Sequence, residues 1–385
     1  MGRADRREII AEIEKLRRSR VLCYVTSDRQ PIGGAISEDA LRPIYRHLRD
    51  IGRTERIDLF LYSRGGQLDV PWRIVSNLRR AADTWEVLVP LRASSSATLV
   101  CLGADQIVFG AQGELGPIDP HWVWKRMVQP PVPGAPPLQV PDTISIEDVL
   151  LYARFAREHW GLHGEESLAS AFGKLADRID AVQLGSIYRS KLHIHDTARE
   201  VLLSRRSPPD EATLQRIVET LSQEVHAHNH AIPLEAARAL GLPAVAAEPA
   251  LEALMWRLFE DFEDEMKLLA PLDPAVAVAL RDVYEEEVIT AAVEGVNAAD
   301  HLTGRIEVRA KRNLPPGLTV NVTVNVPAVE GIDPTQNKAA WMELLTQVRV
   351  TAVQSAVQAA QATVSGYGVV ASESSLRAPL WVRKP

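Results

Sequence analysis

Short apolar runs alternate with amphipathic stretches over the first 110 residues of the chain. Apolar runs of strand length predict four buried strands: RVLCYVTS (20–27), RIDLFLYS (56–63), WEVLVPL (85–91) and QIVFG (106–110). Stretches with apolar residues three or four positions apart predict four helices: 3–20, 37–52, one from about Asp69, and 95–104. Strands that are apolar on both faces and alternate with helices predict an α/β fold with a mostly parallel sheet.

The later chain has a different pattern. The predicted elements are a proline-rich loop (129–141), a mainly helical region (145–245), a charged pair of helices (246–298), a β-hairpin (304–327) and a long Ala/Val/Gln-rich helix (335–365). We therefore expect three parts: a core over 1–245, a helical segment over 246–300, and a hairpin with a long helix over 301–385.

Composition and charge narrow the class of protein. The chain has 385 residues, of which 46% are hydrophobic and 24% charged, as in ordinary globular proteins. A net charge of −7 gives no reason to expect nucleic acid, and no apolar run reaches the roughly 18 residues needed for a membrane span. The charged N-terminus does not resemble a secretory signal, and Cys23 and Cys101 stand in apolar surroundings as free thiols. These features predict a cytoplasmic protein.

Three consecutive serines stand where a predicted strand ends and a helix begins, in VLVPLRASSSATLVCLGADQIV (87–108). In an α/β unit such a junction lies at the carboxyl edge of the sheet. The free N–H groups and positive dipole end of the helix favour a serine alkoxide, and the oxyanion that forms when it attacks a carbonyl. Capping of the helix is the alternative role for Ser94 or Ser95.

A second strand–helix junction precedes the serines, in LYSRGG (61–66). Two glycines let the backbone approach a ligand closely and aim N–H groups at it. Neighbouring strand ends that offer glycine amides and a serine are parts of an acyl-transfer site. A tight turn alone is the other explanation of the glycine pair.

Three segments resemble the serine dehydrogenase proteinase family, which is related to ClpP and to signal peptide peptidase SppA. They are RIDLFLYSRGGQLDVPWRIVSNLR (56–79), VPLRASSSATLVCLGADQIVFGAQGELGPIDP (89–120) and AIPLEAARALGLP (231–243). The resemblance covers roughly residues 10 to 245. It implies a ClpP/crotonase-like fold, in which ββα units wind into a superhelix, and ring-shaped homo-oligomers.

The resemblance also implies roles for single residues. Ser95 matches the nucleophile, because the family's small-Ser-Gly-Gly-Thr pattern aligns on it. The N–H groups of Gly66 and Ser96 then form the oxyanion hole, and Gly65 shapes the turn. The chain departs from the pattern at Ser96 and Ala97, which replace glycines. Both keep an N–H group but crowd the pocket.

The same resemblance suggests the proton acceptor. ClpP-like chains carry a histidine roughly 25 residues after the serine, and His121 follows Ser95 by 26 positions. The residue at the place of the orienting acid is Asn229, and His228 and His230 beside it are alternative bases. An asparagine can hold the imidazole tautomer but does not stabilise imidazolium as a carboxylate does.

Lysine and metal chemistry are less favoured. SppA-like enzymes use a lysine base, but the matching region here is the proline-rich segment, which contains none; Lys125 and Lys191 are the remaining candidates. His226, His228 and His230 alternate as zinc ligands on a strand can, yet no cysteine or acidic cluster completes the set. We therefore expect neither a metal nor a cofactor.

The combined features predict an intracellular, ATP-independent serine endopeptidase that cleaves peptide or protein substrates through an acyl-enzyme on Ser95. The altered serine loop leaves a second class open, a catalytically inactive ClpP-like scaffold or binding subunit. A third is a crotonase-type acyl-CoA enzyme, although such a site needs no serine at the helix start. The alternating TVNVTVN (319–325) needs a pairing strand, which also favours a homo-oligomer.

Overall fold

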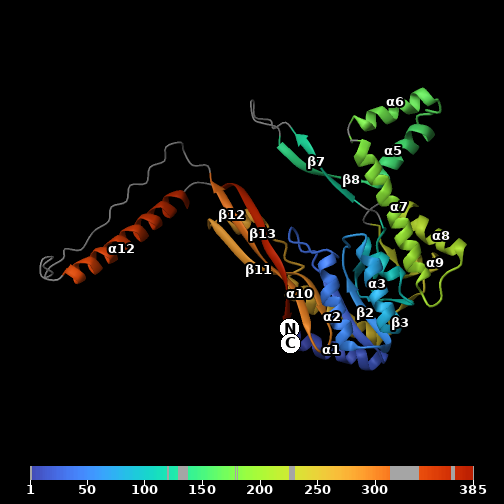
Figure 1. Cartoon of the computed structure of the whole chain (residues 1–385), viewed down its shortest axis with the longest axis horizontal. Helices are drawn as coiled ribbons and strands as arrows, with labels where there is room; N and C mark the ends of the chain where they lie inside the picture. Colours follow the sequence, from blue (N-terminus) through green and yellow to red (C-terminus); the bar gives the residue numbers. More distant parts are fainter. Residues whose placement is uncertain are drawn as a thin grey trace. The chain divides into compact units, whose positions relative to one another are not determined.

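The computed structural model describes residues 2–118, 121–128, 138–177, 179, 181–224, 230–312, 338–365 and 369–384. By their contacts the residues divide into two units: 1–270 with 289–303 and 380–385, and 271–288 with 304–379. Helices and strands alternate along most of the first unit (Figure 1). The predicted α/β class is confirmed, whereas the superhelical winding of ββα units stays a prediction.

An eight-stranded sheet runs in the order β10-β5-β3-β2-β1-β11-β12-β13. Its strands are β1 (Arg20–Thr26), β2 (Thr54–Tyr62), β3 (Ala82–Val89), β5 (Gln106–Phe109), β10 (Ala244–Ala246), β11 (Val283–Glu294), β12 (Ala299–Arg312) and β13 (Val369–Lys384). The strands β1, β2, β3, β5 and β10 pair in parallel. β11 pairs antiparallel with β1, where Tyr24 lies opposite Val293. The four predicted strands are thus confirmed, and their carboxyl ends share one edge.

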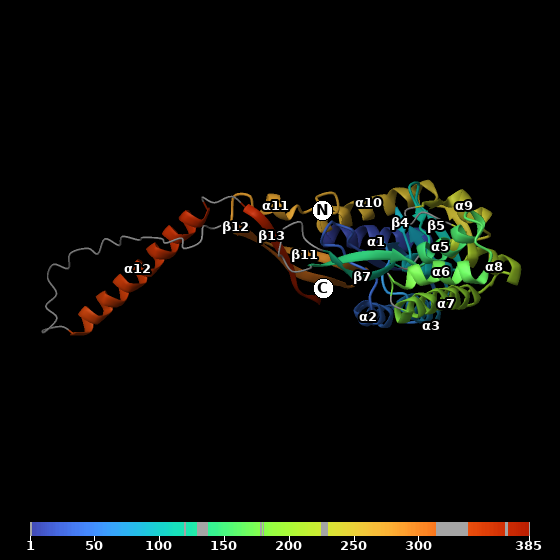
Figure 2. The same ribbon diagram turned by 90° about the horizontal axis from the view of Figure 1, so that it is seen from above.

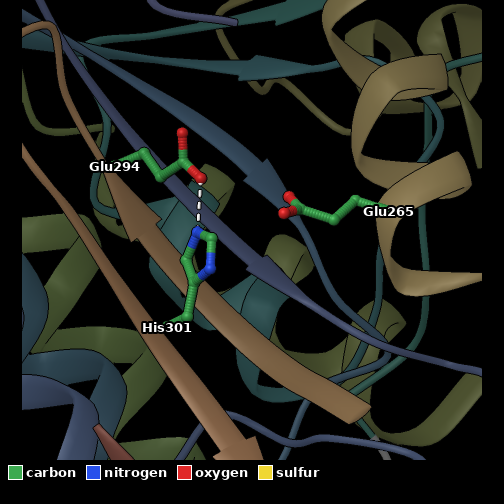
Figure 3. Close-up of side chains that lie close together, drawn as sticks. All are labelled: Glu265, Glu294 and His301. Atoms are coloured by element: carbon green, nitrogen blue, oxygen red, sulfur yellow. Dashed lines mark hydrogen bonds and ion pairs between the residues drawn. The ribbon is translucent and has the colours of Figure 1, made fainter. Parts of the chain in front are cut away.

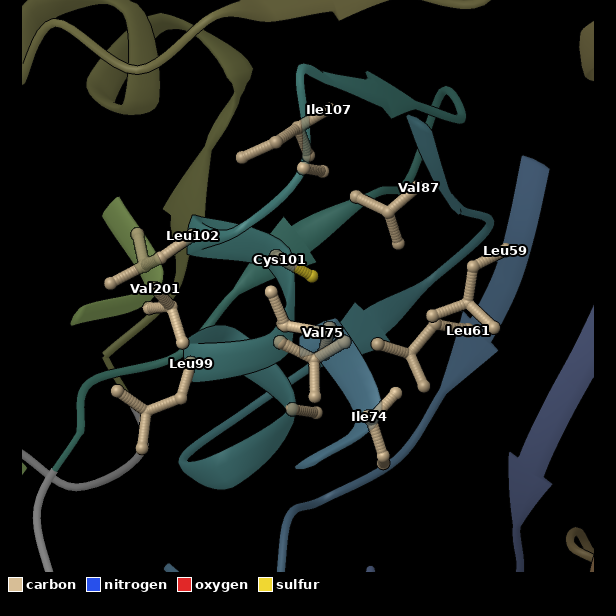
Figure 4. Close-up of a cluster of buried hydrophobic side chains, with 14 of the residues drawn as sticks. Leu59, Leu61, Ile74, Val75, Val87, Leu99, Cys101, Leu102, Ile107 and Val201 are labelled. Atoms are coloured by element: carbon tan, nitrogen blue, oxygen red, sulfur yellow. The ribbon is translucent and has the colours of Figure 1, made fainter. Parts of the chain in front are cut away.

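Helices cover both faces of this sheet (Figure 2). One face packs against α1 (Arg3–Arg17) and α10 (Pro249–Met266); the other packs against α2 (Leu41–Ile51), α3 (Val70–Ala81), α4 (Ser96–Leu102), α7 (Ala181–Leu203) and α8 (Glu211–Glu219). Side chains alternate between the faces, so Leu22 and Tyr24 join the α2–α3 core while Cys23 and Val25 join the α1–α10 core. Figure 4 shows part of the first core, in which Cys101 of α4 packs among aliphatic side chains.

The remaining elements are shorter or lie outside this sheet. They are η1 (Glu38–Ala40), β4 (Arg92–Ala93), β6 (Glu114–Leu115), β7 (His121–Val128), β8 (Leu138–Ser145), α5 (Ile146–Glu158), α6 (Glu165–Ala176), η2 (Thr220–Glu224), β9 (Ile232–Pro233), α9 (Leu234–Ala239), α11 (Pro274–Ala277) and α12 (Lys338–Ser365). The strands β4, β6 and β9 form a small second sheet, and β7 pairs with β8. None of the described helices is both long and apolar enough to cross a membrane.

Three predictions about the later chain need correction. Residues 138–141, expected in a loop, belong to β8, where Pro141 lies opposite Lys125; a two-stranded ribbon has free edges on which proline is tolerated. The predicted helix pair over 246–298 is instead one long helix, α10, followed by the short α11 and the strand β11. The hairpin expected at 304–327 begins earlier, as β11 and β12, and residues 313–337 lie outside the described part.

Candidate active site

The serine junction lies between β4 and α4, with Ser95 at the N-cap of the helix. Ser95 has φ 55° and ψ −121°. It is one of three non-glycine residues with positive φ in the described chain; the other two, Arg18 and Lys267, end helices in the ordinary left-handed conformation. The ψ of Ser95 lies outside that region, so its backbone is strained. Such strain persists only where neighbouring interactions fix it, and it is concentrated at functional sites.

Backbone hydrogen bonds fix the serine junction from two sides. The N–H of Ser95 donates to the carbonyl of Pro117 at 3.2 Å, and the N–H of Ser94 donates to the carbonyl of Ser63 at 3.0 Å. The buried Thr98 hydroxyl lies 2.9 Å from the carbonyl of Ala93 and 2.7 Å from that of Gly116. These bonds tie the start of α4 to the ends of β2, β4 and β6.

The glycine turn after β2 lies against the serines, as predicted. Gly65 has φ +105°, and a Cβ atom added there would lie 2.7 Å from Cβ of Ser95 and 3.1 Å from the nitrogen of Ser96. The N–H of Gly65 donates to Oγ of Ser63 at 3.0 Å. The N–H groups of Gly66 and Ser96 form no hydrogen bond with another described residue. The role of these two N–H groups as oxyanion-hole donors stays a prediction.

The short strand β9 lies close to the serine junction and follows His230 in the chain. Ile232 of β9 lies opposite Leu115 of β6, and Leu115 lies opposite Ala93 of β4. A pocket of about 280 Å³ opens there, and its lining residues are Arg64, Arg92, Ser94, Glu114, Leu115, Gly116 and His230. Among the predicted bases in the described part of the chain, His230 lines this pocket together with Ser94.

The three other residues predicted to act with Ser95 are His121, His228 and Asn229. His228 and Asn229 lie outside the described residues. His121 begins β7 opposite Ser145, but its side chain is not among those described. The roles of His121, His228 and Asn229 stay predictions.

Charged residues that the sequence did not single out line this pocket. Arg64 lies 2.8 Å from Asp28, and Arg92 lies 2.7 Å from Glu114, in each case through Nε. Each of these two arginines is therefore paired with a carboxylate. Arg64 belongs to the SRGG motif itself. Its position beside the glycine pair was the one feature of the sequence that could have indicated a place in the pocket.

Half-buried Glu265 and the buried Glu294 and His301 form a second cluster, in which the possible ligand atoms lie within 4.8 Å of one another (Figure 3). Nη2 of Arg6 already lies 2.5 Å from Glu265 and 2.8 Å from Glu294. Its Nη1 lies 2.5 Å from the buried Asp261. A guanidinium that bridges the carboxylates opposes a metal ion, so the arrangement is an ion network that joins α1 to α10 and β11.

The network shifts the titration of its members. Burial raises the pKa of Asp261, and Arg6 offsets this only in part. Burial also acts to raise the pKa of Glu294, but the hydrogen bonds from His301 and Arg6 outweigh it and lower that pKa to about 2 from 4.5. Glu294 therefore stays ionised in the folded chain.

With this geometry in place, a comparison with known families can be made for the N-terminal third of the chain. Residues 2–132 match the family model of ClpP-like SDH-type serine proteinases. The matched family agrees with the resemblance seen in the sequence, and the matched span contains both the glycine turn and the serine junction.

Two proteins of Methanocaldococcus jannaschii are similar to this chain. Uncharacterized protein MJ0137 is 28% identical over 122 residues, which are 30% of this chain and 43% of the relative. Uncharacterized protein MJ1495 is 28% identical over 118 residues, or 29% of this chain and 40% of the relative. The matched segment thus covers less than half the length of either relative.

The depressed pKa of Glu294 predicts a loss of stability in acid. Because the folded-state pKa lies below the ordinary value, the stabilisation is complete above pH 4.5 and is lost as the pH falls towards 2. The difference corresponds to about 3 kcal/mol of unfolding free energy. Urea unfolding at pH 7 and pH 3 measures the part that is lost above pH 3, about 2 kcal/mol. The Glu294→Gln variant should have a lower free energy of unfolding than wild type at pH 7, and that free energy should fall less between pH 7 and pH 3. The control variant Glu38→Gln, at an exposed site, should behave as wild type. If Glu294→Gln loses as much unfolding free energy on acidification as wild type does, Glu294 is not the source of the acid sensitivity.

Proposed function

We propose that the chain is a serine peptidase that forms an acyl-enzyme on Ser95. The observation that carries the proposal is the strained backbone of Ser95 at the strand–helix junction, with Gly65 packed against it. A sharp turn of this kind presents a serine Oγ at the carboxyl edge of a sheet, as nucleophile elbows do. The family match over residues 2–132 supports the same chemistry.

The proposed reaction uses three groups. Oγ of Ser95 attacks the carbonyl carbon of a peptide bond while an imidazole takes the hydroxyl proton. The N–H groups of Gly66 and Ser96 stabilise the oxyanion, and the imidazole then gives its proton to the leaving amine. Water, activated by the same imidazole, releases the acyl group. The reaction needs neither ATP nor a metal, and we place it in the cytoplasm.

The base is chosen among His230, His228 and His121. The shared pocket with Ser94 favours His230, whereas the family spacing favours His121. Asn229 then orients the ring by accepting a hydrogen bond from it.

A catalytically inactive scaffold is the alternative function. Ser96 and Ala97 stand where the family pattern has glycines. The Ser96 hydroxyl is buried without a hydrogen-bond partner among the described residues, which is an unfavourable feature for a finely arranged site. A scaffold requires only the fold and its surfaces.

A fluorophosphonate probe tests the nucleophile. Wild-type protein should be labelled covalently, and Ser95→Ala should lose labelling completely because no acceptor oxygen remains at the strained position. Ser94→Ala is the matched control and should keep labelling within about tenfold. Mass spectrometry of the labelled peptide locates the adduct. Labelling of neither protein would support the scaffold.

The same assay identifies the base. Of the variants His230→Gln, His228→Gln and His121→Gln, one should slow labelling by about 100-fold or more. Its rate should also lose the wild-type dependence on pH near neutrality. If all three react at the wild-type rate, the histidine mechanism is wrong.

Replacement of Gly65 tests the packing behind Ser95. The Cβ of Gly65→Ala would lie 2.7 Å from Cβ of Ser95, and φ +105° disfavours alanine. We expect labelling of Ser95 to fall by at least about tenfold, with a lowered melting temperature. Gly173→Ala, where the added Cβ meets nothing within 4 Å, is the control. Unchanged labelling in Gly65→Ala contradicts the proposed geometry.

A further inference from the structure

The small pocket beside the serine junction contains two arginines that carboxylates hold in place. Nε of Arg64 lies 2.8 Å from Oδ2 of Asp28, and Nε of Arg92 lies 2.7 Å from Oε1 of Glu114. Asp28 also lies 4.0 Å from Nη1 of Arg92, so one carboxylate lies beside both guanidinium groups. Burial raises the pKa of the Tyr62 hydroxyl, and the neighbouring Asp28 raises it further, so the phenol stays protonated and can donate to this carboxylate. Both arginines are therefore positioned before any ligand arrives.

Each arginine still has N–H groups that the described part of the chain does not use. The carboxylates bind the Nε side of each guanidinium, and among the described residues neither Nη atom of Arg64 nor Nη2 of Arg92 has a hydrogen-bond or ion-pair partner. The side chain of Arg64 is 52% exposed, whereas that of Asp28 is 12% exposed and does not line the pocket. A group that enters the pocket therefore meets two guanidinium groups and the single carboxylate of Glu114, one oxygen of which already accepts from Arg92.

The pocket adjoins the proposed nucleophile through two segments. Ser94 lines the pocket and directly precedes Ser95. Arg64 lines it and directly precedes Gly65, which packs against Cβ of Ser95. A volume of about 280 Å³ suits one side chain or chain end better than a larger ligand. A group bound there belongs to the same substrate molecule as the carbonyl group that Ser95 attacks.

We propose that this pocket binds a carboxylate of the substrate through the Nη groups of Arg64 and Arg92. The inference rests on the proposed peptidase function and adds a substrate class to it, namely peptides with a negative charge close to the cleaved bond. An acidic side chain and a free C-terminus can each supply that carboxylate. In both cases the contact is a charge-assisted hydrogen bond, for which the planar guanidinium is well suited.

Peptide binding to a full-length variant that cannot form an acyl-enzyme tests the pocket. Isothermal titration calorimetry of Ser95→Ala uses four acetylated alanine pentapeptides: an amide with a central glutamate, an amide with a central glutamine, an all-alanine amide, and an all-alanine peptide with a free C-terminal carboxylate. An acidic peptide should bind at least about tenfold more tightly than its uncharged counterpart. Preference for the central glutamate identifies a side chain as the source, and preference for the free carboxylate identifies the chain end.

Arginine variants test the two residues in the same Ser95→Ala background. Arg64→Gln/Arg92→Gln should reduce the preference for the acidic peptide to less than about twofold, because an amide cannot form the ion pair. The control Arg53→Gln/Arg73→Gln also removes two arginines that pair with carboxylates, but outside the pocket, and should keep the preference. Circular dichroism checks that each variant is folded. Arg64→Gln alone, at a half-exposed site, should weaken the preference even if the double variant does not fold.

The outcomes separate this inference from the proposed function. It is overturned if acidic and uncharged peptides bind equally, if the acidic peptides do not bind at millimolar concentration, or if the preference survives in Arg64→Gln/Arg92→Gln. Fluorophosphonate labelling of the wild-type chain would still support the peptidase in each of these cases. Conversely, a preference for acidic peptides without any labelling would retain the carboxylate site and contradict the peptidase.

Discussion

The strained backbone of Ser95 is the feature on which the candidate site depends. A serine does not adopt φ 55° with ψ −121° unless surrounding bonds hold it there. The carbonyl of Pro117, the carbonyl of Ser63 and the two bonds of Thr98 supply this constraint. All come from segments that leave the sheet at its carboxyl edge, so the parallel order of the strands creates the conditions for the strain.

The sequence predicted this edge well because the signals are local. Continuous apolar runs mark β1, β2, β3 and β5, and the serine and glycine motifs stand directly after two strand ends. The neighbourhood of Ser95 and Gly65 follows from that order alone. Ser95 was predicted as a nucleophile from its place in the motif, whereas its backbone strain depends on tertiary bonds that no local pattern encodes.

Contacts between distant parts of the chain could not be predicted in this way. β4, β6 and β9 have two residues each, too few for any periodicity, yet their pairing brings His230 to the pocket. β11 was predicted as helix because its acidic outer half hides the strand alternation. Arg6 bonds to Glu294 across 288 positions, and neither residue shows in the sequence that it is buried. Whether such a charged residue is buried or exposed can be decided only when its partner in the fold is known.

The ion network around Arg6 has a consequence for how the chain can be divided. β11 covers the edge of β1, and Glu294 at its end accepts both a guanidinium and an imidazole. A fragment that stopped after β10 would expose the backbone of β1 as an open edge and leave Arg6 without one of its buried carboxylates. Residues 289–303 therefore stabilise the first unit, to which they belong by their contacts, although more than two hundred residues separate them from β1 in the chain.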